Sequence, residues 1–274
     1  MRGIDLPRGR KSMVAFMTCG YPERDLFVRL MMEAVRAGAD ALEIGIPFSD
    51  PLADGPTIQR ANCAVLNRGF RMEVFFETVR ELSSSLGVPL IGMSYYNPIL
   101  SYGEERFVER ALEVGLSGLI VPDLPFDEGR PFYSRCRELG LDPVLMLTPL
   151  TPEERARRIL AESSGFVYCV SFLGVTGAHK EVSMSWVKGV VSALRRESPI
   201  PLLLGFGLRS GSMVRSISPH VDGVVLGSAL VNVIDESALH GTDPIAGVGE
   251  LLREVREALD GGDEAIQIPP LALV

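Results

Sequence analysis

The sequence predicts an α/β fold in which eight parallel strands, each followed by a helix, close into a (β/α)8 barrel, the TIM barrel. Eight short apolar runs recur along the 274 residues, and segments with helical periodicity separate them. The runs are almost continuously apolar, as is typical of parallel strands that are covered on both faces. An open doubly wound sheet more often has about five or six strands, whereas a TIM barrel takes about 250 residues. The number of runs and the chain length therefore favour the closed barrel.

The expected strands share an apolar composition and are bounded by turn or helix signals. They are Met13–Thr18, Ala41–Pro47, Pro89–Tyr95, Gly118–Pro122, Pro143–Leu147, Phe166–Ser171, Pro201–Phe206 and Gly223–Leu226. Several of them follow directly on the end of an expected helix, which supports a repeated helix-to-strand unit.

Amphipathic segments lie between these runs. In Arg24–Ala37 the apolar residues form one stripe, and Gly38 marks the end of the helix. Thr151 is expected to cap a helix that begins with Pro152 and two glutamates. The other expected helices are Glu73–Leu86, Glu104–Val114, Gly129–Leu139, Ser185–Arg196 and Gly247–Leu259.

Composition and charge indicate a single domain over residues 1–274, with a barrel core at about 13–259 and an extra tail at 260–274. No linker or charge block divides the chain. The net charge of −8 argues against nucleic-acid binding, which normally uses a basic face. The N-terminus is short and polar for a signal peptide, and no apolar run approaches the ~18 residues of a membrane span. We therefore expect no membrane contact and a cytoplasmic location.

Two kinds of chemistry find no support in the sequence. A Schiff-base enzyme needs a lysine at a strand end, but the expected strands contain no lysine. The three histidines lie on separate segments, so no metal site is expected. The cysteines fall in or beside apolar segments and are expected to be buried structural thiols; they are Cys19, Cys63, Cys136 and Cys169. With these two kinds of chemistry set aside, proton transfer by carboxyl groups is the remaining type of catalysis.

Glu43 is a carboxyl group in the middle of an apolar strand. Burying a charged carboxylate costs several kcal/mol unless it is partnered or protonated. If its face points into the barrel, Glu43 lies in a dry pocket of the kind that raises a carboxyl pKa toward acid–base use. The alternative is a structural glutamate paired with an arginine from a helix.

The loop after this strand carries two further acids and is stiffened by prolines. Asp50 and Asp54 stand next to Pro51 and Gly55, and Pro56 follows. Aspartate before proline or glycine is common turn chemistry, so the spacing alone leaves the two acids as turn formers or as functional groups.

Three glycine-rich segments end the last three expected strands. They are Gly174–Gly177, Gly205–Gly207 and Gly227–Ser228. In TIM barrels the loops after strands seven and eight, with a helix N-terminus, often bind phosphate. Glycines let backbone N–H groups approach the anion, although each segment alone is also compatible with a tight turn. No GxGxxG follows the first strand, which excludes a dinucleotide fold.

With these residues in place, the sequence resembles the tryptophan synthase alpha subunit family. The most specific match is Leu42–Gln59, which contains Glu43 and Asp54. Further matches cover roughly residues 13–259; they are Phe16–Pro22, Tyr95–Pro98, Val121–Pro125, Gly174–Gly177, Gly205–Gly207 and Gly227–Ala229. The family cleaves indole-3-glycerol phosphate to indole and glyceraldehyde 3-phosphate.

The resemblance implies roles for individual positions. Glu43 and Asp54 match the catalytic acids, and Tyr168 matches a tyrosine near the reacting carbons, although a core aromatic is the plain alternative. The resemblance implies phosphate binding at Thr176, Gly177, Gly207, Gly227 and Ser228. Phe16, Met93 and Tyr95, with Ile58, are the expected walls of the indole slot. Asp50, Pro51 and Asp123 match positions near the mobile loops and the partner.

The resemblance also implies a partner: a beta subunit that carries pyridoxal phosphate and receives the indole in an α2β2 complex, with no cofactor in this chain. Two other hypotheses stay open, namely a stand-alone lyase and an inactive barrel that only regulates a partner. Two departures from the family stand out. Phe172 and Leu173 replace a basic residue that some members carry, and Met1–Lys11 is too short to form the usual N-terminal helix.

Overall fold

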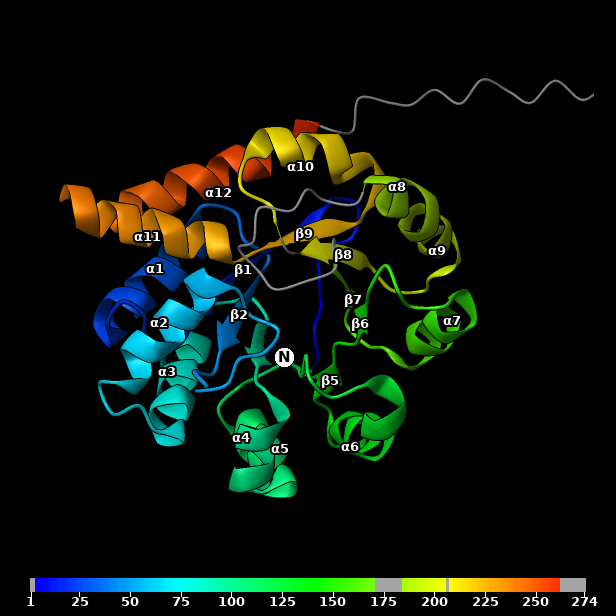
Figure 1. Cartoon of the computed structure of the whole chain (residues 1–274), viewed down its shortest axis with the longest axis horizontal. Coiled ribbons are helices and arrows are strands. Elements are labelled where there is room, and N and C mark those ends of the chain that lie inside the picture. Colours follow the sequence, from blue (N-terminus) through cyan, green and yellow to red (C-terminus); the bar gives the residue numbers. More distant parts are fainter. Residues whose placement is uncertain (1–2, 171–183, 206, 262–274) are drawn as a thin grey trace, which may run out of the picture.

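The computed structural model describes residues 3–170, 184–205 and 207–261, and its strands form one parallel sheet that curls into a ring surrounded by helices (Figure 1). The sheet order is β5-β4-β3-β2-β1-β9-β8-β7-β6. The strands are β1 (Ser12–Thr18), β2 (Ala41–Gly45), β3 (Leu90–Met93), β4 (Gly118–Ile120), β5 (Asp142–Pro143), β6 (Met146–Leu147), β7 (Val167–Val170), β8 (Leu202–Gly205) and β9 (Gly223–Leu226). The expected TIM barrel is confirmed.

The ring closes through the chain segment that contains β5 and β6. β5 pairs with β4, and β6 pairs with β7. Between them, the Val144 N–H donates to the Leu119 carbonyl, while the Leu145 carbonyl accepts from the Tyr168 N–H. The single strand expected at Pro143–Leu147 is therefore two short strands, because each half of the segment hydrogen-bonds to a different neighbour.

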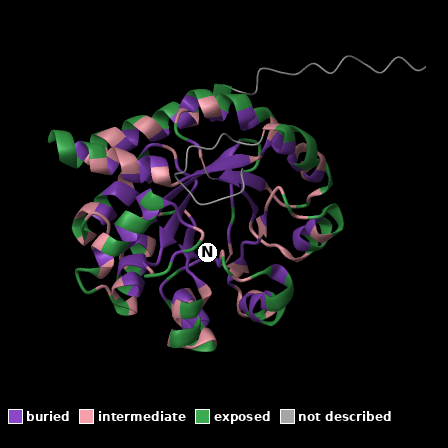
Figure 2. Cartoon of the chain, in the orientation of Figure 1, coloured by how far each residue is buried: buried purple, intermediate pink, exposed green. Residues whose placement is uncertain are grey.

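Side chains on the strands alternate between two apolar cores. Val14 and Phe16 of β1 point into the barrel, whereas Met13 and Met17 of the same strand pack outward against the helices. Both faces are buried along every strand except β5 and β6, each of which has one half-buried residue, and this explains the uninterrupted apolar runs (Figure 2). The register pairs Phe16 with Glu43 across β1 and β2, so Glu43 points inward with Phe16.

Each expected amphipathic segment is helical, with different ends, and further helices lie between them. They are α1 (Arg24–Arg36), α2 (Pro56–Leu66), α3 (Met72–Ser85), α4 (Tyr96–Tyr102), α5 (Glu104–Glu113), α6 (Phe126–Leu139), α7 (Glu153–Glu162), α8 (Met184–Trp186), the π-helical turn η1 (Val187–Val191), α9 (Ser192–Glu197), α10 (Gly211–Ile217), the short η2 (Ser218–His220), α11 (Ser228–His240) and α12 (Pro244–Asp260). Full burial of a side chain such as Phe27 or Phe75 stabilises the fold by roughly 1.5–3 kcal/mol.

Several local expectations need correction. The helix expected from Gly129 begins at Phe126 and contains Pro131. Thr151 does not cap α7, because Pro152 is the N-cap and the Thr151 hydroxyl instead accepts from the Thr148 N–H at 3.0 Å. Cys63 is exposed, because it lies on the outer face of α2, whereas the other three cysteines are buried as expected.

An extended N-terminal segment closes the amino-terminal end of the barrel. The Ile4 N–H donates to the Asp142 carboxylate at 2.6 Å, and Ile4 and Leu6 join the inner core. Residues 3–11 contain no helix, as expected, and the side chains of Ile4 and Leu6 fill the space instead. Among the described residues, no helix is long and apolar enough to cross a membrane.

Candidate active site

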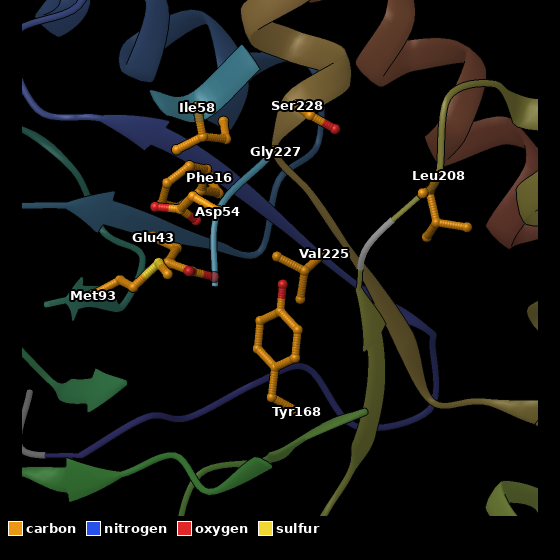
Figure 3. A pocket seen from close by; sticks show the side chains of 11 residues that line it. Phe16, Glu43, Asp54, Ile58, Met93, Tyr168, Leu208, Val225, Gly227 and Ser228 are labelled. Carbon is orange, nitrogen blue, oxygen red and sulfur yellow. The ribbon is translucent and has the colours of Figure 1, made fainter. Parts of the chain in front are cut away.

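One pocket in the barrel collects most of the candidate residues (Figure 3). Its volume, counted together with the open space at its mouth, is about 420 Å³. Its walls are Phe16, Glu43, Asp54, Ile58, Met93, Tyr168, Gly207, Leu208, Val225, Gly227 and Ser228. The residues come from several strands, strand ends and helices, so only the closed barrel brings them together. Figure 3 shows Glu43, Asp54 and Tyr168 projecting from three separate segments into this space.

Glu43 lies in the middle of β2 with 2% of its surface exposed. Its Oε2 atom is buried and has no hydrogen-bond partner among the described residues. Burial raises the pKa of Glu43 to about 8, and the negative charge of Asp54 adds to the effect. No arginine is paired with Glu43 in the described part of the chain, so the structural alternative considered for this residue does not apply. The raised pKa favours the protonated form of Glu43 at neutral pH.

Asp54 is buried although it lies on a loop; 4% of its surface is exposed. Its N–H donates to the Pro51 carbonyl at 2.9 Å, and the Gln59 side chain donates to its carbonyl at 2.8 Å. Burial raises the pKa of Asp54 to about 7, and hydrogen bonds with Tyr95 and Asn62 oppose the rise. The loop thus holds a second carboxyl group in the same pocket as Glu43.

Tyr168 points into the barrel from β7 and is buried. Burial, with the charges of Glu43 and Asp54, raises its pKa well above the ordinary value, so the phenol keeps its proton. A Cβ atom placed at Gly205 would lie 2.3 Å from the Tyr168 hydroxyl. Glycine at the end of β8 therefore makes room for the tyrosine.

Phe16 is held between two glycines. An added Cβ would come within 2.8 Å of its ring at Gly45 and within 2.9 Å at Gly227. Phe16 and Met93 line the pocket together, as the indole-slot expectation requires. Tyr95 does not line it: the Tyr95 hydroxyl accepts from the Ala53 N–H at 2.9 Å and supports the Asp54 loop from behind.

The structure describes three of the five residues that are expected to bind the phosphate. Gly207, Gly227 and Ser228 line the pocket, whereas Thr176 and Gly177 lie outside the described residues, as do Phe172 and Leu173. Gly227 caps α11 without a side-chain hydrogen bond. The first N–H groups of a helix have no partner within the helix, so the start of α11 offers free donors and a positive dipole end.

The expected loop and partner residues lie on loops that follow the strands and do not line the pocket. Asp50 is exposed and Pro51 is buried in the loop after β2. The Asp123 carboxylate follows β4 and accepts from the Tyr96 N–H at 2.8 Å, which joins two neighbouring loops. Asp123 also lines a second cavity between the β4–α6 and β6–α7 loops.

The structure adds residues that the sequence did not single out. Leu208 and Val225 line the pocket, and Asn62 on α2 contacts Asp54. A signal for Asn62 was present: it occupies an apolar position in the stripe Ile58, Ala61 and Val65, where a polar side chain needs a partner. Among the described residues, no group of three or more His, Cys, Asp and Glu side chains is arranged to hold a metal ion.

Comparison with known proteins gives one consistent family. The model of the family described as tryptophan synthase alpha chain matches residues 5–259. The tryptophan synthase alpha chain of Petrotoga mobilis is 40% identical over 249 residues, which cover 91% of this chain and 93% of the relative. That of Roseiflexus castenholzii is 43% identical over 249 residues, or 90% and 94% of the two chains.

Solved structures agree with the sequence relatives. The crystal structure of tryptophan synthase alpha chain from Legionella pneumophila superposes with a TM-score of 0.83 at 33% identity, covering 93% of this chain and 94% of that one. A chain of Mycobacterium tuberculosis tryptophan synthase superposes with a TM-score of 0.81 at 33% identity, covering 91% and 93%.

Proposed function

The chain belongs to the tryptophan synthase alpha chain family, and we propose that Glu43 and Asp54 together perform the cleavage characteristic of that family. The protein is a carbon–carbon lyase of tryptophan biosynthesis that acts on indole-3-glycerol phosphate. It releases indole and glyceraldehyde 3-phosphate, and indole passes to the beta subunit. The observation that carries the proposed roles is the pair of buried carboxyl groups in one pocket, with Glu43 Oε2 unpartnered among the described residues.

Glu43 performs both proton transfers. A pKa of about 8 keeps it protonated at neutral pH, so it donates a proton to C3 of the indole ring. The carboxylate that remains takes the proton of the hydroxyl group on the adjacent carbon, and the C–C bond electrons return to the ring as indole and aldehyde separate. Glu43 gives up one proton and gains one, so it is protonated again for the next cycle.

Asp54 stabilises the charge that develops on the ring. Protonation at C3 makes the indole nitrogen positive, and a fixed carboxylate beside the N–H lowers the energy of that state. The Asp54 pKa of about 7 places the group near its titration point, so the positive ring draws it into the ionised form. Tyr168 lies beside both acids and orients the reacting carbons.

The substrate lies with its ring between Phe16, Ile58 and Met93 and its phosphate at the start of α11. Gly207, Gly227 and Ser228 supply the phosphate end, together with Thr176 and Gly177 from the segment outside the described residues. Free N–H groups and the helix dipole attract the anion there.

The alpha chains of this family work with a beta partner. We extend this to an α2β2 assembly in the cytoplasm, with pyridoxal phosphate in the beta subunit and a single barrel domain in this chain. The docking face is the carboxyl-end face of the barrel, where Leu52, Leu100 and Leu150 are 80%, 55% and 71% exposed. Exposed leucines gathered on one face, from two loops and from α4, are typical of a protein interface.

The test is an assay of indole release from indole-3-glycerol phosphate by the purified chain, with and without a cognate beta subunit. Cleavage that depends on Glu43 and Asp54 and rises with the partner supports the proposal. Full cleavage by the free chain and a flat titration would identify a stand-alone lyase. No cleavage under either condition would identify a barrel that only regulates its partner.

A further inference from the structure

Asn62 is a buried amide whose two ends face two different groups. It lies in the second turn of α2, and 4% of its surface is exposed. Its Nδ2 atom donates to Asp54 Oδ2 at 3.5 Å, and its Oδ1 atom accepts from the Thr18 hydroxyl at 3.3 Å. Thr18 ends β1 and is fully buried. A chain of hydrogen bonds therefore runs from the end of β1 through α2 to Asp54.

We propose that Asn62 is a positioning residue for Asp54, and that the Thr18 hydroxyl fixes the Asn62 amide in the orientation this role requires. The inference rests on the proposed function, because it assigns Asp54 a part in the cleavage. Asn62 itself does not line the substrate pocket and so acts through Asp54.

The chemistry of the three groups selects one orientation of the amide. An ionised carboxylate only accepts hydrogen bonds, so the Asn62 NH2 group must face Asp54. The carbonyl end then faces Thr18, whose hydroxyl donates to it. A rotated amide would direct its oxygen at the carboxylate, and two acceptors would repel each other. Both hydrogen bonds are long, as hydrogen bonds of catalytic groups often are before substrate binds.

The other groups that face Asp54 carry no positive charge, so the ionised form of Asp54 depends more on the Asn62 amide. They are Glu43 from β2, Tyr95 after β3 and Tyr168 from β7. Two are phenols and one is an acid, so no cation among these neighbours favours the ionised form. The Tyr95 hydroxyl, which accepts from the Ala53 N–H, also donates to the Asp54 carboxylate, and Asn62 is the amide donor beside it. The hydrogen bonds from Tyr95 and Asn62 lower the pKa of Asp54 against the effect of burial.

The first experiment follows the titration of Asp54 directly, by the 13Cγ resonance of the side chain in the full-length protein. Asn62→Ala should make the Asp54 carboxyl a roughly tenfold weaker acid, the effect of losing one hydrogen bond to a charged group. Asn67→Ala is the control, since Asn67 lies at the end of the same helix, away from Asp54. An Asp54 titration that is unchanged in Asn62→Ala overturns the proposal.

A matched pair of variants at Thr18 tests the proposed role of the Thr18 hydroxyl. This test does not depend on whether the Asn62→Ala variant folds. Thr18→Val keeps the shape but removes the hydroxyl, whereas Thr18→Ser keeps the hydroxyl. Thr18→Val should shift the Asp54 titration in the same direction as Asn62→Ala, and Thr18→Ser should leave it near the wild-type position. Equal titrations in the two variants refute the role of Thr18.

Kinetics separate this inference from the proposed function. In Asn62→Ala, kcat at pH 7 should fall about fivefold with little change in KM, and the acid limb of the pH profile should move to higher pH. If Asp54→Asn stays active, the proposed function fails, whatever the resonance shows. If Asp54→Asn is inactive but Asn62→Ala keeps the wild-type acid limb, only the present inference fails.

Discussion

Asp54 lies close enough to Glu43 for its negative charge to raise the Glu43 pKa beyond the effect of burial. The two carboxyl groups come from one strand and the loop that follows it, and both are nearly inaccessible to water. Burial and the neighbouring negative charge favour the protonated form of Glu43 at a pH where a solvent-exposed glutamate would lose its proton. This arrangement suits proton delivery and has a cost in stability.

Glu43→Gln should abolish proton transfer while it preserves the shape of the site. We expect kcat to fall at least ~100-fold, the low end for loss of a general acid–base group, with substrate affinity nearly unchanged. Steady-state indole release and direct substrate binding measure the two effects. Glu250→Gln, an exposed glutamate of α12, is the control. A folded Glu43→Gln variant that keeps a tenth of wild-type kcat would contradict the assigned role.

The same substitution should change how stability depends on pH. The folded-state pKa values of Glu43 and Asp54, about 8 and about 7, lie above their ordinary values of 4.5 and 3.8. Their contribution to stability is therefore fully present below about pH 4 and is lost as pH rises through about 8.

Urea unfolding at pH 5 and at pH 8.5 tests this linkage. Relative to wild type, Glu43→Gln should gain a few kcal/mol of unfolding free energy between the two pH values, since each raised pKa unit is worth about 1.4 kcal/mol. Glu250→Gln should follow wild type across the range. Parallel pH profiles for Glu43→Gln and wild type would show that the acid ionises freely in the folded protein.

Ser228→Asp should weaken phosphate binding. A carboxylate at the start of α11 repels the phosphate and competes for the free N–H groups, so KM should rise at least about tenfold while kcat changes less. Ser228→Ala should bind almost normally, because backbone groups do the binding. This pair is cleaner than a substitution at Gly207, whose φ of +79° strains any larger residue. Similar KM values for Ser228→Asp and wild type would place the phosphate elsewhere.

Leu52→Asp should uncouple the chain from its partner. Leu52 is exposed on the loop that carries Asp54, and it does not line the pocket. We expect a beta subunit to raise wild-type cleavage by one to two decades, on the order of 1.4–2.8 kcal/mol of coupling. The variant should keep its basal rate and lose most of this rise in a beta-subunit titration. A normal response would show that this loop lies outside the interface.

The sequence predicted the barrel because burial on both faces leaves uninterrupted apolar runs, and it predicted Glu43 because a carboxyl group interrupts one of them. It did not predict the division of the fifth strand, since two short strands with different partners have the same composition as one. The expectation that Cys63 is buried was wrong, because a residue at the edge of an apolar stripe can face either the core or the solvent.

The sequence patterns did not predict which residues from distant parts of the chain come into close contact. Gly227 was expected to make room for an anion, and the structure shows that it also makes room for the ring of Phe16. Tyr95 was expected to face the ring of the substrate, but its hydroxyl supports the Asp54 loop. Both facts depend on how strands from distant parts of the chain pack.

Ile4 and Leu6 close the barrel at its amino-terminal end, so the pocket is a pit with its mouth on the opposite face. A product formed at the bottom of a pit leaves by the route that the substrate took in. With the substrate placed as proposed, glyceraldehyde 3-phosphate is held near the rim and indole is formed deeper between Phe16 and Met93, so both products pass the same loops. In the proposed assembly, a partner on that face lies at the mouth of the pocket, where it can receive the indole before the surrounding water does.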